Sequence, residues 1–420
     1  MPNDQLIMEN PYNLHQGRKV IINMELFRLY GFYQLLNPRT KRVFGFKIYL
    51  LAHMTFIILN AIIVLYSLTG IIYAVFYGKL ITYDQLFELL FYYCNYPFCL
   101  YKLYTLINNS NFIWKFYDIA CVNFLPNSYV QRAKKIMNNY IGLSKTFTWL
   151  CLVFFILIIC VWSIFPLVFG RNLNESSILN LMYPVSSKTF EKYFYIFYLL
   201  EFSLLTFIMY AILMFDIFIA SFCFAITAQY ETIMKSVKKL GTTYDLTSAN
   251  KEDSQIKYCE DLKNIIINYQ KVNTKLMDFF GVIRRVILIQ IADFSIGLVS
   301  LAYLLVLRLS NNNTKIVDLK LVISFIAIAI EFFMECYLLE LVTEKKEEFN
   351  LNLFKCNWTN MNLNFKKWML LTQKQNNANQ INLKLSPKKI ISVQLFLSVI
   401  NTSYTVVSVI LNTISSPDKK

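Results

Sequence analysis

The sequence predicts an all-α membrane protein with seven transmembrane helices, a cytoplasmic N-terminus, an extracellular C-terminus and a cytoplasmic helical anchor region. Three observations lead to this fold class. Hydrophobic residues make up 56% of the 420 residues and charged residues 16%, against about 25% charged in ordinary soluble proteins. The apolar residues fall in runs long enough to cross about 30 Å of hydrocarbon. The basic residues concentrate in alternate segments between those runs.

Seven apolar segments reach the roughly 20 residues that a spanning helix needs. They are residues 46–68, 84–107, 148–170, 192–226, 281–308, 319–343 and 389–413. The second segment is the most polar, because Glu88, Asn95 and Lys102 interrupt it. Residues 1–45 lack the apolar core and cleavage site of a signal peptide, so the first span is expected to direct insertion.

The orientation follows from the basic residues. One set of segments holds 27 Lys and Arg, and the set on the other side of the membrane holds 6. The first set comprises residues 1–46, 108–147, 227–280 and 344–388. Because positive residues stay cytoplasmic, the N-terminus is predicted inside. The same topology accounts for the net charge of +15, and basic-aromatic motifs for nucleic acid are missing, so we expect no nucleic-acid partner.

Residues typical of catalysis or metal binding are scarce. The nine cysteines fall in spans or cytoplasmic segments, so no disulfide framework is expected. Two histidines leave little room for a metal site, and His53, inside the first span, is expected to make a buried polar contact. No Gly-rich phosphate loop, G-x-S-x-G, H-E-x-x-H or C-x-x-C motif occurs. We therefore expect no enzyme, no metal and no cofactor.

Six carboxylates lie inside the predicted spans. They are Glu88, Glu201, Asp216, Asp293, Glu331 and Glu335. Charged groups are costly in lipid and are candidates for function by default. Glu331 and Glu335 lie four apart on one helical face, which would suit a proton or metal relay. Because no histidine or cysteine within the membrane is suitably spaced beside them, we favour hydrogen bonds between helices.

Two cytoplasmic stretches show the 3–4 spacing of helices that pack together beneath a membrane. The first seam consists of Tyr258, Leu262, Ile265, Tyr269, Val272, Leu276 and Phe279. The second, the anchor, consists of Phe354, Trp358, Met361, Phe365 and Trp368. Docking on the same subunit and a subunit interface both stay open for these faces. Gly241 and the polar run after it, and residues 374–387, are expected to be loops.

The last span carries a polar stripe. Gln394, Ser398, Asn401, Thr405, Ser408 and Asn412 follow one another at spacings of 4, 3, 4, 3 and 4. At about 100° per residue they share one helical face. Such a face needs partner helices or water along its whole length. We favour a helix that lines a pore, with buried packing as the alternative.

Aromatic side chains gather in the predicted outer halves of spans two, three and four. They are Phe87, Phe91, Tyr92, Trp162, Phe165, Tyr198 and Phe202, with Met209 beside them. An apolar site with a few hydroxyl groups suits a small, mostly hydrocarbon ligand. The alternative is that these residues are ordinary packing or interface aromatics.

The C-terminal third carries a recognisable order of residues. A Cys near the end of the sixth span is followed by a Trp-bearing cytoplasmic stretch, a Pro and a closing span of the form F-x-x-I/V-x-x-x-S-Y. In this chain these are Cys336, Trp358, Trp368, Pro387 and "FLSVINTSY". With the fourth span, "YLLEFSLLTFIMYAILMFDIFIASF", and its Asp216, the chain resembles the insect odorant receptors over most of its length. Glu201 stands where that family commonly has Gln.

The resemblance implies a ligand-gated, non-selective cation channel in the plasma membrane of olfactory dendrites. The channel would be a heterotetramer with the obligate odorant co-receptor, with the last spans around the pore and the cytoplasmic anchor holding the subunits together. By position, Val409 matches the family's hydrophobic gate, Thr413 its second constriction and Asn412 a polar residue at the outer mouth. Binding of a small volatile apolar odorant would favour a state in which the last spans move apart.

The chain resembles an odorant-specific tuning subunit, because residues 227–280 are shorter than the co-receptor's loop. In the family the pocket lies among spans two, three, four and six, which adds Phe325 to the candidate ligand-binding residues. A gustatory receptor is the alternative, although Ile410 and Leu411 replace its Q-F pair. A G-protein-coupled receptor would need the opposite orientation, and no internal repeat indicates a transporter built from inverted halves.

These expectations divide the chain into five parts. They are a cytoplasmic segment 1–45, a ligand-binding bundle 46–343 that includes a cytoplasmic extension 227–280, an anchor helix and loop 344–388, a pore-lining helix 389–413 and an extracellular tail 414–420.

Overall fold

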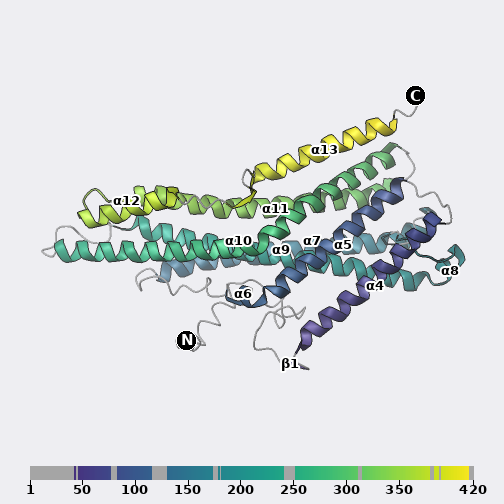
Figure 1. Ribbon diagram of the computed structural model, residues 1–420, viewed down its shortest axis with the longest axis horizontal. Helices are drawn as coiled ribbons and strands as arrows, with labels where there is room; N and C mark the ends of the chain where they lie inside the picture. The colour runs from purple at the N-terminus through teal and green to yellow at the C-terminus, as the bar shows by residue number, and fades with distance from the viewer. Residues whose placement is uncertain are drawn as a thin grey trace.

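The computed structural model is an elongated bundle of long helices (Figure 1). It describes residues 42–43, 46–76, 83–115, 130–173, 178–179, 181–240, 251–310, 315–378, 383–386 and 389–415. The predicted N-terminal segment, apart from its last few residues, and most of the tail lie outside these ranges. Cys121 lies outside them too, and the other eight cysteines are free thiols.

The long helices of the described part are α4 (Ile48–Phe76), α5 (Tyr83–Asn108), α7 (Val130–Leu173), α9 (Phe194–Lys238), α10 (Lys251–Ser310), α11 (Lys315–Phe354) and α13 (Val393–Ser415). The shorter ones are α6 (Ser110–Lys115), α8 (Ser187–Lys192) and α12 (Leu363–Ala378). Two antiparallel hairpins pair β1 (Arg42–Val43) with β2 (Phe46–Lys47) and β3 (Lys384–Ser386) with β4 (Lys389–Ile390).

Six of these helices are long and apolar enough to cross a membrane, so the predicted helical membrane fold is confirmed. The long helix outside this group is α5, the one that Glu88, Asn95 and Lys102 make polar. Several helices continue well past the predicted span ends. At 1.5 Å per residue the 60 residues of α10 extend about 90 Å, three times the hydrocarbon thickness.

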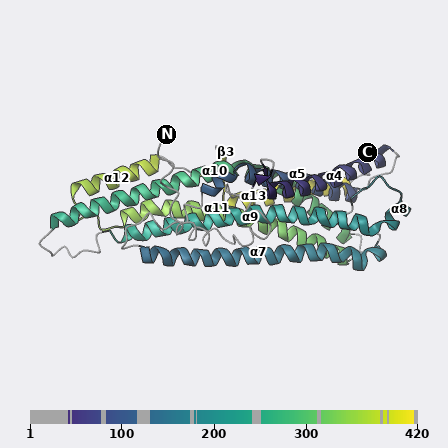
Figure 2. The same ribbon diagram turned by 90° about the horizontal axis from the view of Figure 1, so that it is seen from below.

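Helix α9 is the centre of the bundle. Its most apolar window is 83% buried, whereas that of α4 is 11% buried, so α4 lies at the periphery. α9 packs against α11, α7, α5, α10 and α4, and Figure 2 shows α7 along one long side of the molecule. The His53 ring on α4 reaches the hydroxyl of Tyr210 on α9 at 2.9 Å, which confirms the polar contact expected of that histidine.

The packing expected of the first seam is confirmed. All seven of its side chains, from Tyr258 to Phe279, are buried along one face of α10. Tyr269 stacks on Phe349 of α11 with ring centroids 3.8 Å apart, and the Phe279 ring stacks on Phe222 of α9 at 3.7 Å. The three helices therefore continue out of the transmembrane bundle as a packed stalk.

The anchor is divided between the interior and the surface. Met361 and Phe365 are buried, whereas Phe354 is 59% and Trp368 43% exposed, and Trp358 is half-buried. The anchor, for which docking on the same subunit and a subunit interface both stayed open, is therefore only partly buried within a single chain. The reason is a break in the helix: α11 ends at Phe354 and α12 begins at Leu363, so the 3–4 spacing is interrupted.

Residues 374–387 are not the single loop predicted from their composition. Their first part continues α12 to Ala378, and Lys384–Ser386 form strand β3. Leu383 and Leu385 are buried, and Arg284 of α10 donates hydrogen bonds to the carbonyl of Leu385 at 2.9 and 3.3 Å. Two buried leucines and one arginine thus hold this segment in place.

Helix α13 packs on α10 and α11 and runs along the outside of the bundle (Figure 1). Its buried side chains are Leu395, Val399, Ser403 and Val407. A spacing of four places them on one face, and the polar stripe lies on other faces of the helix.

Gly70 of α4 allows a close approach between helix and loop. A β-carbon there would lie 2.6 Å from the carbonyl carbon of Met182 and 2.8 Å from that of Tyr183. We expect Gly70→Ala to lower the stability of the purified chain by about 1–3 kcal/mol through overpacking. Melting in detergent, followed by size-exclusion fluorescence, measures this loss.

Gly142 provides the matched control, because it is also helical and a β-carbon there meets nothing within 4 Å. Gly142→Ala should leave the melting temperature unchanged or raise it, since alanine is the better helix former by about 1 kcal/mol. Equal effects of the two substitutions would contradict the close contact at Gly70.

Candidate ligand cavity

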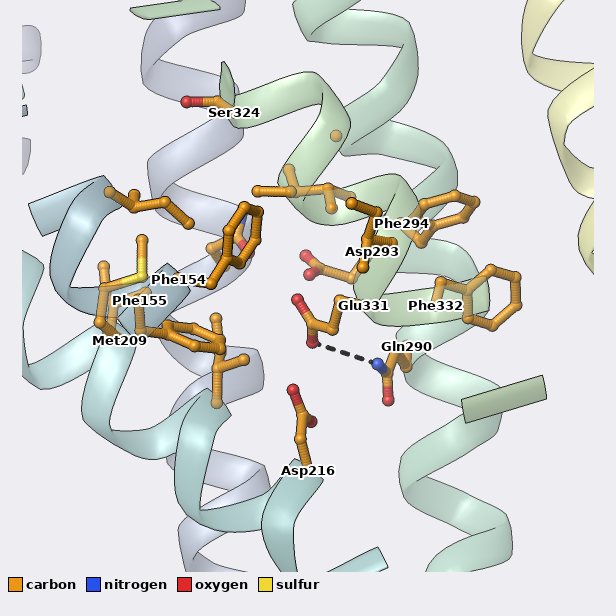
Figure 3. A pocket seen from close by; sticks show the side chains of 18 of the residues that line it. Phe154, Phe155, Met209, Asp216, Gln290, Asp293, Phe294, Ser324, Glu331 and Phe332 are labelled. Carbon is orange, nitrogen blue, oxygen red and sulfur yellow. Dashed lines mark hydrogen bonds between the residues drawn. The ribbon is translucent and has the colours of Figure 1, made fainter. Parts of the chain in front are cut away.

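The helices α5, α7, α9, α10 and α11 surround a cavity of about 130 Å³. By the same measure one water molecule needs roughly 10–15 Å³, so the cavity has room for a small organic molecule. Its lining is mostly apolar (Figure 3). Along α11 the cavity extends from Ser324 to beyond Glu335, a helical rise of about 16 Å.

Aromatic side chains form the Ser324 end of the cavity. The indole nitrogen of Trp162 donates a hydrogen bond to the Ser324 hydroxyl at 3.0 Å. The ammonium of Lys320 lies 4.0 Å from the centre of the Trp162 ring and donates to the carbonyl of Ile178 at 2.8 Å. Trp162 is 3% exposed, so these polar contacts fix its ring as a rigid wall.

The segment before α8, of which residues 178–179 and 181–186 are described, forms a strap that lies against this end. Leu179 lines the cavity, and its backbone N–H donates to the Glu201 carboxylate at 2.7 Å. Burial, and then the nearby Glu201, raise the pKa of the Tyr183 phenol. Glu201 thus has a structural task as an acceptor for the strap.

Charged side chains form the other end of the cavity. The Lys102 ammonium, on α5, lies 3.0 Å from Glu331 Oε1 on α11 and 3.4 Å from Asp216 Oδ1 on α9. Gln290 of α10 donates to the same Glu331 oxygen at 3.3 Å. Lys102 is 0% exposed. The predicted hydrogen bonding between helices is confirmed for Glu331, and its partner is a lysine that the sequence showed only as an interruption of span two.

Four of the nine predicted ligand-binding residues line this cavity. They are Phe91, Tyr92, Trp162 and Met209. Two others pack beside it in a small cluster: Phe87, whose ring lies 4.2 Å from that of Tyr303, and Phe325.

Two further predicted residues, Tyr198 and Phe202, are not among the described residues that line the cavity. Tyr198 donates to the carbonyl of Ser163 at 2.8 Å, and Phe202 packs against the main core. The side chain of Phe165 lies outside the described part of the chain.

The cavity has contributors that the aromatic search missed. Residues on one face of α7 line it: Phe147, Cys151, Phe154, Phe155 and Ile158. Their 3–4 spacing continues to Trp162 and is a helical pattern that would have identified them. The fifth span also contributes, through Gln290, Asp293, Phe294 and Gly297 of α10, although the expectation named only spans two, three, four and six.

Two cavity residues also touch the last helix. The Phe396 ring of α13 lies 6.2 Å from the Phe294 ring and 6.0 Å from the Phe332 ring. Both Phe294 and Phe332 line the cavity. The cavity and α13 therefore share a wall of aromatic side chains.

The polar stripe of α13 is uncovered within the chain. Gln394, Ser398, Asn401, Thr405 and Asn412 are exposed, as is Val409, and Ser408 is half-buried. A groove of about 600 Å³ runs along Gln394, Ser398, Asn401 and Thr405. Thr405 and Ser408 donate to backbone carbonyls four residues earlier. The side chain of Thr413 lies outside the described residues.

This architecture is that of a multi-pass membrane protein with a ligand-sized cavity inside its helical bundle. The family model described as 7tm Odorant receptor matches residues 82–404. The chain therefore belongs to the odorant receptor family, a family of receptors. No curated protein sequence matches it.

Solved structures give the same fold. The insect olfactory receptor OR5 from Machilis hrabei superposes with a TM-score of 0.71 at 14% identity, covering 96% of this chain and 98% of that one. The complex of that receptor with eugenol gives a TM-score of 0.70 at 15% identity, with the same coverage. These structures are similar in fold, and the predicted membership of the insect odorant receptor family is confirmed.

Proposed function

We propose that this chain is the odorant-specific subunit of a ligand-gated, non-selective cation channel in the plasma membrane of olfactory dendrites. A small volatile odorant binds in the cavity between α5, α7, α9, α10 and α11. The pore is lined by α13 from each subunit of a heterotetramer with the odorant co-receptor. The N-terminus is cytoplasmic and the C-terminus extracellular, as the distribution of basic residues indicates.

The observation that carries the proposal is the exposed polar stripe of α13. An apolar helix face that contacts only lipid would not carry an amide or hydroxyl at every turn, since polar groups in hydrocarbon are costly. Gln394, Asn401 and Thr405 are exposed in the single chain. Water in a pore on the assembly's axis satisfies these groups and explains why the chain itself leaves them uncovered.

Exposed apolar groups of the anchor support an assembly of subunits. Phe354 and Trp368 are large and partly exposed, and Leu363, Leu370 and Leu371 of α12 are exposed as well. Aromatic residues with low conformational freedom are typical of interface hot spots. We assign this surface to contacts with neighbouring subunits.

The fold likeness to a receptor solved with eugenol supports the assignment of the cavity to an odorant. Recognition in such a cavity is mainly by shape and dispersion, with few polar groups to orient the ligand.

The test is current under voltage clamp in cells that express this chain with and without an odorant co-receptor. Volatile esters, alcohols, aldehydes and amines are applied to each. We expect an odorant-evoked cation current in the pair and none from either subunit alone for the same ligand. Surface labelling confirms delivery of the chain in every case.

Two outcomes would contradict the proposal. A tastant-evoked current from this chain without the co-receptor would favour the gustatory alternative. A response that requires G-protein signalling and persists when the α13 stripe is mutated would exclude the channel.

A further inference from the structure

The acidic end of the ligand cavity has more negative than positive groups. Asp216, Asp293, Glu331 and Glu335 all line it, and Lys102 is the basic side chain seen paired with two of them in the described part of the chain. Figure 3 shows the carboxyl groups of Asp216, Asp293 and Glu331 turned toward the same space. Buried charges of one sign need protons or a cation for compensation.

The same end has acceptor atoms without donors. Glu335 is 4% exposed, and among the described residues no donor lies in hydrogen-bond geometry with either of its carboxylate oxygens; its polar neighbours are Gln290 and Asp216. Gln290 is 3% exposed, donates its amide to Glu331 and leaves its oxygen equally without a donor. Both residues line the cavity. A ligand that complements this end must bring N–H or O–H groups.

The opposite end has a different chemistry. Trp162, Phe154 and Phe155 form an apolar surface there and along α7, and the polar atoms of Trp162 and Ser324 bond to each other. No hydrogen-bonding capacity of Trp162 is left for a ligand, since the indole has one donor. This end therefore suits a hydrocarbon or aromatic group.

We propose that the ligand of this cavity is a small organic amine, bound as its ammonium ion, with the nitrogen near Glu335, Gln290 and Asp293 and the hydrocarbon part along the apolar lining that leads toward Trp162. A primary ammonium has three donors and no acceptor, which matches a site with three open acceptor atoms. A hydroxyl group has one donor and no charge, so an alcohol of the same shape complements the site less well. This inference deepens the proposed function and names the class of odorant.

Direct binding tests the inference independently of current. The purified full chain in detergent is titrated with hexylamine and 2-phenylethylamine, and with the matched alcohols 1-hexanol and 2-phenylethanol. Tryptophan fluorescence and thermal stabilisation report binding. We expect both amines to bind roughly 10- to 100-fold more tightly than the matched alcohols, the range typical of hydrogen bonds to charged groups.

Three variants assign the effect to residues. Glu335→Gln and Asp293→Asn should each weaken amine binding roughly tenfold and leave alcohol binding unchanged. Glu260→Gln is the matched control, because Glu260 is an exposed carboxylate on the cytoplasmic part of α10. It should alter neither. Asp293→Asn keeps the test decisive where Glu335→Gln fails to fold.

The inference is overturned where amines bind no better than alcohols, or where Glu335→Gln and Asp293→Asn leave the preference for amines intact. The first result would mean that protons neutralise the carboxylates. Failure of the proposed function is a separate result: amine binding to the purified chain with no current from any odorant of the panel in the co-receptor pair would keep the inference and contradict the channel.

Discussion

Lys102→Met should produce the largest loss of stability of any single substitution in the bundle. The lysine ammonium is fully buried and lies within ion-pair distance of Asp216 and Glu331. Methionine matches the length of the side chain but removes the charge, which leaves two buried carboxylates without their cation. Removing one partner of a buried ion pair costs about 3–5 kcal/mol. The expected result is a chain that loses its monodisperse peak in detergent at a much lower temperature than the parent.

A compensating set of substitutions separates charge from packing. Asp216→Asn and Glu331→Gln in the Lys102→Met background remove the two negative charges at nearly constant shape. They should recover most of the melting temperature, because a neutral polar cluster carries no unpaired buried charge. The reverse outcome, in which the triple variant is less stable than Lys102→Met, would show that the lysine acts through packing on Phe98 and Phe215, whose rings lie 4.8 and 5.2 Å from its ammonium.

Asn401 should control cation flow with little effect on folding. It is exposed in the middle of the stripe of α13 and lines the groove along that helix. On the proposed pore axis, Asn401→Lys brings positive charge next to permeating cations, and Asn401→Asp brings negative charge. We expect the lysine variant to lower the odorant-evoked current by roughly tenfold or more and the aspartate variant to raise the permeability of divalent cations, because rings of charged side chains select ions by sign.

The same pair of substitutions at Asn138 is the control. Asn138 is an exposed asparagine near the beginning of α7 and belongs neither to the cavity nor to the stripe. Asn138→Lys and Asn138→Asp should leave the current unchanged at equal surface expression. If both pairs act alike, or if Asn401→Lys conducts normally, α13 does not line the pore with this face.

The predictable parts of this fold depend on local patterns. Apolar runs identified the long helices, and the 3–4 spacing of Tyr258, Leu262 and Ile265 identified the seam on α10 before any contact was known. These signals depend on a residue and its neighbours within two or three turns of one helix. The burial of Met361 and the exposure of Trp368 could not be predicted in this way, because they depend on where α11 ends.

The charged end of the cavity shows the limit more clearly. Lys102, Asp216 and Glu331 lie on three helices and are more than 100 residues apart along the chain. Each one alone weakens the pattern of its span, and their mutual compensation exists only once the helices are packed. Carboxylates within the predicted spans marked candidate functional residues in the sequence. Which of them pair with Lys102 could be seen only in the tertiary structure.

The aromatic wall between the cavity and α13 has a mechanical consequence. Phe294 and Phe332 have one side toward the ligand space and a ring neighbour, Phe396, on the last helix. A ligand that shifts either ring acts directly on α13, without an intervening loop that could absorb the movement. Because α10 is one uninterrupted helix from the stalk to this wall, the stalk would serve as a fixed frame for the movement of α13 that the proposed function requires. On the proposed function, binding of an odorant would thus move α13 through a single layer of side chains.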